Sequence, residues 1–404
     1  MINVAILGFG VVGSGVMEII SERADALVGK TGEKLNVKYI LDIRDFSGHP
    51  MAEKFTKSFD VILDDPEVSI VAEVIGGLDP AYTYTKKALE AGKNVVTSNK
   101  ELVARKGAEL LQIAKDNGVS YLFEASVGGG IPIIRPLNQC LAANRITELM
   151  GILNGTTNYI LTSMIRKGKS FEEALAKAQE LGYAERNPEA DVEGIDACRK
   201  VAILASLITG KTVDSDKIYT EGITKITLQD VKCAESLGFV IKLIGYIQVC
   251  DDKVFTRVSP LLVDKNSPLA VIEDVFNGAL VVGDSTGEVM FYGKGAGKRP
   301  TASAVVADII DIAQNNPCGK FMWKDTDQKD FMVPLAESCS HFFLRVQNVK
   351  AELLEKVFGK IVAISDADDN EIAFITAEMN EKEFEDKKDI LGYGNILSCI
   401  RVHR

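Results

Sequence analysis

Asp196 and Lys200 are the residues of this chain whose types and spacing best suit acid–base chemistry. They lie four residues apart in the segment Asp191–Lys200, so on a helix both side chains point the same way. We expect this helix to begin after Pro188 and to bury its apolar continuation, Val201–Leu207, which would hold its first half rigid. Such a pair could bind a small polar substrate and move a proton to or from it. The alternative is a surface ion pair, which contributes only about 0.3–0.5 kcal/mol.

A further acid, Glu185, precedes this helix in the sequence Gly182-Tyr183-Ala184-Glu185. Glu185 and Asp196 would offer a substrate ammonium two carboxylates, while Lys200 would offer a cation to its oxygen. The alternative interpretation of Glu185 is an acidic residue of a surface loop.

The glycine pattern Gly8-Phe9-Gly10-Val11-Val12-Gly13 indicates a phosphate-binding loop. It follows an apolar strand at residues 2–7 and opens a helical pattern, which is the order that a dinucleotide fold requires. Gly8 would permit the tight turn, Gly10 the approach of a pyrophosphate, and Gly13 close packing of helix on strand. The helix N-terminus would then present unpaired N–H groups to the phosphates.

Two further positions in this region favour a nucleotide site. Asp42 ends the second strand, where an acid usually binds the ribose hydroxyls of NAD, and Arg44 could instead face the 2′-phosphate of NADP. Ser98 and Lys100 follow a later strand, at the edge where open α/β sheets bind ligands. The choice between NAD and NADP stays open, and the alternative for each of these charges is a solvated loop residue.

The segment from Glu124 to Pro132 is a glycine-rich loop with two interpretations. Its glycines would let several carbonyl groups turn inward beside one carboxylate, which suits a hard monovalent cation, or they would form an interdomain hinge. The residues alone favour the hinge. A second glycine loop, residues 293–301, would close over the cofactor or link domains.

The pattern of elements predicts an α/β protein of three parts. Strands alternating with helices indicate a parallel sheet. A β-rich block with crossing helices follows, with the active cleft between it and the first domain, and then a small α+β unit. Strands are expected at 2–7, 37–41, 68–72, 94–97, 120–123, 146–153, 255–263 and 279–291, and helices at 81–91, 104–117, 171–181 and 301–313. Asn154–Asn158 is expected to be a turn leading into a helix, and Asn315–Pro317 a linker.

The composition restricts the class of protein. The chain has 404 residues, 46% of them apolar and 25% charged, which is typical of a globular protein of two or three domains. A net charge of −11 argues against nucleic acid or an anionic membrane as partner. We expect neither a signal peptide nor a membrane span, and the seven dispersed cysteines suggest a reducing cytoplasm. His49, His341 and His403 form no metal or triad pattern.

Six segments, in order, resemble homoserine dehydrogenase. They are GFGVVGSG, TSNKELVA, EASVGGGIPIIRPL, GILNGTTNYIL, LGYAERNPEADVEGIDACRKVAILAS and GAGKRPTASAVVADI, between residue 2 and about residue 315. The resemblance implies NAD(P)H-dependent interconversion of L-aspartate 4-semialdehyde and L-homoserine, a step towards threonine and methionine. It also implies a dimer or higher homo-oligomer.

The resemblance implies a role for each matched position. Lys200 would be the proton donor, aided by Asp196 and Lys100, and the substrate would be bound by Glu185, Asp196, Tyr183 and Thr156. The cofactor positions would be Phe9, Gly10, Val11, Val12, Gly13, Arg44, Ser98, Lys100, Gly182 and Gly297. Glu124, Val127, Gly129 and Ile131 match a sodium site, which reverses the preference for a hinge.

The implied domains are a Rossmann-type NAD(P) domain (1–132), a catalytic and dimerisation domain (133–318) and a C-terminal unit (338–404). Helix 300–314 is expected to pack back on the first domain. The C-terminal unit resembles an ACT domain, a small ligand-sensing module, but Gln347-Asn-Val-Lys350 stands where an Asp-x-Pro-Gly turn is usual. Threonine sensing and a role in assembly alone are both open.

Two other functions fit the same residues. One is a dehydrogenase for another amino acid or hydroxy acid, which substrate preference would distinguish. The other is a non-catalytic nucleotide sensor. Lys100, Glu185, Asp196 and Lys200 argue against the sensor, because a sensor needs no proton-transfer lysine.

Overall fold

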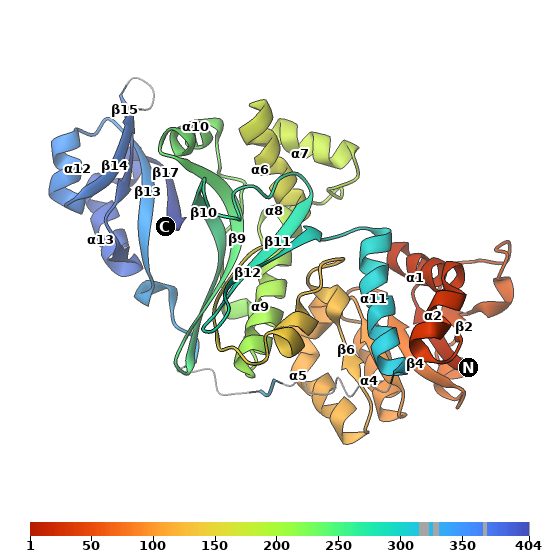
Figure 1. Cartoon of the computed structure of the whole chain (residues 1–404). Coiled ribbons are helices and arrows are strands. Elements are labelled where there is room, and N and C mark those ends of the chain that lie inside the picture. Colours follow the sequence, from red (N-terminus) through yellow and green to blue (C-terminus); the bar gives the residue numbers. More distant parts are fainter. Residues whose placement is uncertain (315–322, 326–330, 367–369, 404) are drawn as a thin grey trace. The chain divides into compact units, whose positions relative to one another are not determined.

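The structure is a computed structural model that describes residues 1–314, 323–325, 331–366 and 370–403 (Figure 1). It separates into two compact units, each assembled from three stretches of the chain. The first comprises residues 1–143, 202–215 and 293–326, and the second comprises residues 144–201, 216–292 and 327–404. The predicted linker at Asn315–Pro317 lies outside the described residues.

The first unit contains a parallel sheet of six strands in the order β3-β2-β1-β4-β5-β6. From β1 the chain adds β2 and β3 on one side, and from β4 it adds β5 and β6 on the other side, as in a Rossmann-type fold. Ligands are expected where the direction changes, at the carboxyl ends of β1 and β4. Gly8 directly follows β1, and Ser98 directly follows β5. The strands are β1 (Ile2–Leu7), β2 (Leu35–Leu41), β3 (Phe55–Thr56), β4 (Val68–Glu73), β5 (Asn94–Thr97) and β6 (Tyr121–Leu122).

The helices of this unit confirm the predicted alternation. They are α1 (Val11–Glu22), α2 (Ala24–Thr31), α3 (Asp60–Leu63), α4 (Ala81–Glu90), α5 (Lys100–Asp116) and α11 (Lys298–Ala313). Helix α5 begins four residues before its predicted start at Ala104, because Asn99 caps it: its side chain accepts a hydrogen bond from the Leu102 N–H. Helix α11 packs on α1, where a methyl group on Gly15 would touch Ala302 and the Lys298 carbonyl.

The second unit is built on a mixed sheet of eleven strands, most of them in the order β12-β11-β7-β9-β10-β17-β13-β15-β14. Strands β9 and β10 form a long antiparallel hairpin that Figure 1 shows clearly. The strands up to β12 are β7 (Ile146–Ile152), β8 (Tyr219–Thr220), β9 (Phe239–Cys250), β10 (Lys253–Asp264), β11 (Phe276–Gly283) and β12 (Gly287–Lys294). The single strand predicted at 279–291 is wrong: Asp284–Thr286 form a turn, and Gly287 has a positive φ of 69° that interrupts a strand.

The helices that accompany these strands include one important correction. They are α6 (Gly155–Lys167), α7 (Phe171–Glu180), α8 (Glu189–Val192), α9 (Ile195–Thr209) and α10 (Leu228–Ser236). The single helix predicted from Pro188 through Lys200 is wrong, because α8 and α9 are separate. Gly194 lies between them with a φ of 79°, a left-handed conformation that breaks helical geometry.

The C-terminal segment has the order strand, helix, two strands, helix, strand. Its main elements are β13 (Cys339–Gln347), α12 (Ala351–Phe358), β14 (Ile361–Asp366), β15 (Glu371–Thr376), α13 (Glu381–Leu391) and β17 (Ile396–His403), with the short β16 (Met379–Asn380). Both helices cover one face of the strands, and Phe342 stacks on Phe384 in the core between them, with ring centroids 3.7 Å apart. Strand β17 pairs in parallel with β10, which joins this segment to the rest of the sheet.

Candidate functional site

Lys200 and Asp196 form an ion pair that is buried rather than exposed. The Lys200 Nζ lies 2.8 Å from the Asp196 Oδ2 and donates a second hydrogen bond, of 2.6 Å, to the Leu153 carbonyl. Only 7% of Lys200 and 4% of Asp196 are exposed. The interpretation as a surface pair is therefore wrong. A charged pair held this deeply needs hydrogen bonds that offset the cost of removing it from water.

Asn154 connects this pair to a second carboxylate. Its Nδ2 donates to Asp191 Oδ1 at 2.7 Å and to Asp196 Oδ2 at 2.9 Å. Its Oδ1 accepts from the Thr157 N–H at 2.9 Å, so the same side chain caps α6. Sequence reasoning treated Asn154 as part of a turn and missed it. The available signal was an N-cap residue directly before a helical pattern.

The structure brings together two of the predicted substrate-binding residues. The Thr156 hydroxyl donates to the Tyr183 carbonyl at 2.8 Å, and the Tyr183 ring packs edge-on against Tyr159. Gly182 ends the preceding turn with a φ of 74°. Glu185 is exposed, and its carbonyl accepts a hydrogen bond from the Gln179 amide. Among the described residues, no hydrogen bond or ion pair connects the Glu185 carboxylate to Asp196 or Lys200.

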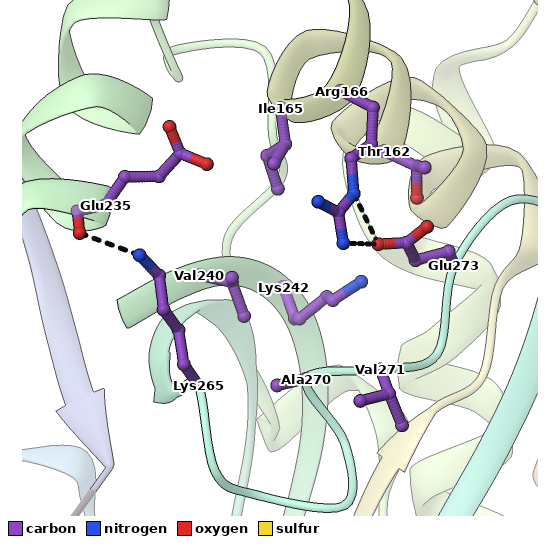
Figure 2. Close-up of a pocket in the computed structure, with 10 residues that line it drawn as sticks. All are labelled: Thr162, Ile165, Arg166, Glu235, Val240, Lys242, Lys265, Ala270, Val271 and Glu273. Atoms are coloured by element: carbon purple, nitrogen blue, oxygen red, sulfur yellow. Dashed lines mark hydrogen bonds and ion pairs between the residues drawn. The ribbon is translucent and has the colours of Figure 1, made fainter. Parts of the chain in front are cut away.

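Helix α6, which begins beside the buried pair, is anchored in its first turn by a second buried lysine. Lys242 donates to Asn158 Oδ1 at 3.2 Å and to the Ile272 carbonyl. Burial lowers the pKa of Lys242 to about 8. This lysine lines a cavity of about 530 Å³ in which Arg166 pairs with Glu273, and Lys265 donates to the Glu235 carbonyl (Figure 2). The cations of this cavity thus hold α6, α10 and the loop after β10 together.

The glycine loop after β1 has the geometry that the sequence predicts. Gly8 has a φ of 96°, and a methyl group on Gly13 would overlap the Gly8 carbonyl oxygen. A methyl group on Gly10 would meet nothing within 4 Å, so this residue leaves its surface open. Helix α1 begins at Val11 and directs its N-terminus towards this loop. The loop can therefore hold a pyrophosphate against backbone N–H groups.

Asp42 and Arg44 form one unit beside this loop. Asp42 Oδ2 accepts from the Phe9 N–H at 2.8 Å, and its two oxygens accept from Nε and Nη2 of Arg44. The Arg44 guanidinium holds the pKa of Asp42 well below its usual range. The Arg44 side chain is 56% exposed, whereas that of Asp42 is 7% exposed. The Asp42 carboxylate therefore holds the loop in place, and the positively charged Arg44 guanidinium is exposed to solvent.

A buried acid that sequence reasoning missed holds the strand ends near Ser98 and Lys100. Glu73 is fully buried and accepts from the Thr97 hydroxyl and the Ile75 N–H. Burial raises the pKa of Glu73. The Asn99 side chain also donates to the Gly77 carbonyl at 2.6 Å. These bonds fix the strand end that precedes Ser98 and the helix cap that precedes Lys100.

The predicted cation loop is closely packed, but its carboxylate is already bonded. Both Glu124 oxygens accept backbone N–H groups, those of residues 133, 134 and 135. Gly129 has a φ of 57°, and a methyl group there would overlap the Gly295 carbonyl. The Gly130 N–H donates to the Lys294 carbonyl, so this loop and the 293–301 loop hold each other. Any cation in this loop would be bound by backbone carbonyl oxygens.

Comparison with known proteins identifies the family. A family model described as "Homoserine dehydrogenase, NAD binding domain" matches residues 8–124, and one described as "Homoserine dehydrogenase" matches residues 132–310. The homoserine dehydrogenase of Bacillus subtilis is 45% identical over 323 residues, which cover 79% of this chain and 74% of that protein. The chain belongs to the homoserine dehydrogenase family. It is therefore an NAD(P)-dependent oxidoreductase that acts on the CH–OH group of L-homoserine. This excludes the two alternatives, a dehydrogenase for another substrate and a non-catalytic nucleotide sensor.

Solved homoserine dehydrogenases share the fold. The enzyme from Thiobacillus denitrificans has a TM-score of 0.91 and 34% identity, and the alignment covers 100% of this chain and 98% of that one. A hyperthermophilic archaeal homoserine dehydrogenase, solved in complex with NADPH, has a TM-score of 0.67 and 30% identity over 78% of this chain and 98% of its own. None of the helices that the structure describes is long and apolar enough to cross a membrane.

Replacing Asn154 tests whether it orients the acids of the site or only caps α6. Asn154→Ala removes both the cap and the amide donor, and Asn154→Ser keeps a cap but removes the donor. We expect both variants to lose about 10–100-fold in kcat for L-homoserine, because misplacing a catalytic group by even 1 Å costs this much. Thermal unfolding should show Asn154→Ser as the more stable variant. A wild-type kcat in Asn154→Ser would show that Asn154 acts only as a helix cap.

Proposed function

We propose that Lys200 is the proton donor in the interconversion of L-aspartate 4-semialdehyde and L-homoserine. The observation that carries this proposal is the buried network of Lys200, Asp196, Asn154 and the Leu153 carbonyl. This network fixes the ammonium group of Lys200 on a rigid helix, as proton transfer requires. Bound NAD(P)H exchanges a hydride with the carbon that carries the substrate oxygen.

Each remaining residue then has a role in holding charge. Lys200 gives a proton to the oxygen as negative charge develops on it, and takes one back in the reverse direction. Asp196 and Glu185 bind the substrate ammonium group, and Thr156 and Tyr183 form the wall beside them. Lys100, at the first turn of α5, assists as a second cation. Asp191 and Asp196 share the Asn154 amide, which orients both carboxylates.

Replacing Lys200 tests the assignment. Lys200→Ala is expected to keep NADPH binding and to lose about 10²–10⁴-fold in kcat, which is the usual contribution of a positioned acid or base. Steady-state kinetics and a fluorescence titration of NADPH measure the two quantities. Lys232→Ala, an exposed lysine on α10, is the matched control. A kcat near that of the wild type in folded Lys200→Ala would refute the role.

The chain is also proposed to hold its nucleotide through Phe9, Gly10, Val11, Val12 and Gly13, with Ser98, Lys100, Gly182 and Gly297. The open loop at Gly10 and the N-terminus of α1 support this proposal. The exposed guanidinium of Arg44 favours NADP(H), because it neutralises Asp42 and still offers charge to a 2′-phosphate.

Arg44→Ala is expected to change cofactor choice rather than catalysis in general. The ratio of kcat/KM for NADPH to that for NADH should fall about tenfold or more, since a hydrogen bond between charged groups contributes about 1.5–3 kcal/mol. Arg23→Ala is the matched control, because Arg23 is an exposed cation at the far end of α1. An unchanged ratio would show that Arg44 does not contact the cofactor.

We also propose a monovalent cation, sodium, bound by the carbonyl groups of Glu124, Val127, Gly129 and Ile131. The support is the close packing of this glycine loop, in which a methyl group on Gly129 would overlap the Gly295 carbonyl. Oxygen ligands of this kind suit a hard cation. When sodium is replaced by tetramethylammonium, we expect the thermal unfolding temperature to fall and NaCl to restore it. Equal unfolding temperatures in the two salts would contradict the proposal.

For the C-terminal segment, we propose an ACT-like domain. Its β-α-β-β-α-β order and its sheet order β17-β13-β15-β14 support this proposal. The two family models match residues 8–124 and 132–310, so this segment lies beyond the part they match. A homo-oligomer, a cytoplasmic location and a place in threonine and methionine biosynthesis are proposed from the family resemblance.

A further inference from the structure

A second cavity, of about 500 Å³, lies where the C-terminal segment joins the mixed sheet. Its walls come from the part of the β9–β10 hairpin next to its turn, from β13 and from the last residues of β17. This volume lies within the range of small-molecule sites. The residues that the argument uses are Tyr246, Phe255, Arg257, Glu337, Ser340 and Glu378.

Arg257 is the charged group of this cavity, and it is almost fully buried. It is 4% exposed, and its guanidinium packs against the rings of both Tyr246 and Phe255, each with its centroid 5.7 Å away. Its Nη1 donates to the Ser340 hydroxyl at 3.3 Å. Within the described residues its Nε–H has no hydrogen-bond partner. A buried donor without a partner costs about 1–3 kcal/mol, and more when it is charged.

The nearest carboxylate, that of Glu381, already forms an ion pair with another arginine. Arg401 binds both oxygens of Glu381 through Nε and Nη2, and its Nη1 donates to Glu221 at 3.1 Å. Arg257 comes only within 3.9 Å of Glu381. Burial, with Arg401 nearby, lowers the pKa of Arg257 to about 10, so the guanidinium still carries its charge at neutral pH. One buried cation therefore lacks a carboxylate of its own.

We propose that this cavity binds a small carboxylate, which pairs with the guanidinium of Arg257 and accepts a hydrogen bond from Ser340. A guanidinium offers a carboxylate several N–H donors, of which Ser340 engages only one, on Nη1 of Arg257. Glu337 and Glu378 line the same cavity, so a single negative charge fits better than the double charge of phosphate. In the described part of the chain, no cluster of histidine, cysteine and acidic side chains suits a metal ion.

Binding at this place would stabilise the junction of β10, β13 and β17. Arg257 belongs to β10 and Ser340 to β13, and β17 pairs with both of these strands. A ligand that binds the folded state alone raises stability by mass action. The expected signature is therefore a saturable rise in the unfolding temperature of the whole protein.

Acetate is the simplest probe of this proposal. We would measure its binding by calorimetry and its effect on thermal unfolding at constant ionic strength, with chloride replaced by acetate or by inorganic phosphate. We expect saturable acetate binding with a Kd of about 1–10 mM, as for a small ligand with one strong contact. Arg257→Gln should weaken it at least about tenfold, the loss of one charge-assisted hydrogen bond. Ser340→Ala should weaken it less and serves if Arg257→Gln fails to fold.

The matched control is Arg166→Gln. Arg166 also lines a cavity of similar volume, but it has Glu273 as its own partner, so this variant should bind acetate as the wild type does. The proposal is overturned if acetate shows no saturable binding beyond chloride, or if Arg257→Gln and Ser340→Ala both bind it normally. Stronger Arg257-dependent binding of phosphate than of acetate would overturn the choice of a carboxylate.

Discussion

The buried ion pair of Asp196 and Lys200 is the constraint on which the second unit depends. Removing two charges from water costs free energy, which hydrogen bonds to the pair help to offset. The partners come from separate elements: the Leu153 carbonyl follows β7, Asn154 caps α6, and Asp191 lies in α8. The pair can therefore exist only when strand, cap and both helices are in place.

The surrounding packing explains how these elements keep their positions. A methyl group on Gly245 of β9 would overlap Val201, so α9 approaches the sheet closely just after Lys200. Asn158 and Lys242 fix α6 to the loop after β10. The Ile223 N–H donates to the Val192 carbonyl at 2.8 Å, which holds α8 where the chain must break before α9. Each contact limits how far Lys200 can move.

In the first unit, two acidic side chains hold the glycine loop and the strand ends in place. Asp42 holds the glycine loop through the Phe9 N–H, and Glu73 holds the ends of β4 and β5 through Thr97 and the Ile75 N–H. Both acids are largely buried, and neither needs to touch a ligand to shape the site. Because these strands are parallel, their carboxyl ends meet at one edge, where a sheet of this kind is expected to bind its ligand.

The sequence by itself determined the parts of this protein that depend on local pattern. The glycine loop, the alternation of strands and helices, and the four-residue spacing of Asp196 and Lys200 follow from the preferences of a few neighbouring residues. It also identified the family, because six motifs in a fixed order leave little room for chance. The boundary at Gly194 and the turn within residues 279–291 were missed, since a lone glycine does not reveal its φ angle in advance.

Only the tertiary structure decided which residues satisfy one another. The hydrogen bonds of the Asp196–Lys200 pair, of Asn154 and of the Glu124 carboxylate join residues up to 47 positions apart. The shortage of a carboxylate beside Arg257 depends on Glu381 and Arg401, more than a hundred positions away. Hydrogen bonds and buried charges are satisfied in space, and a linear pattern carries no record of that geometry.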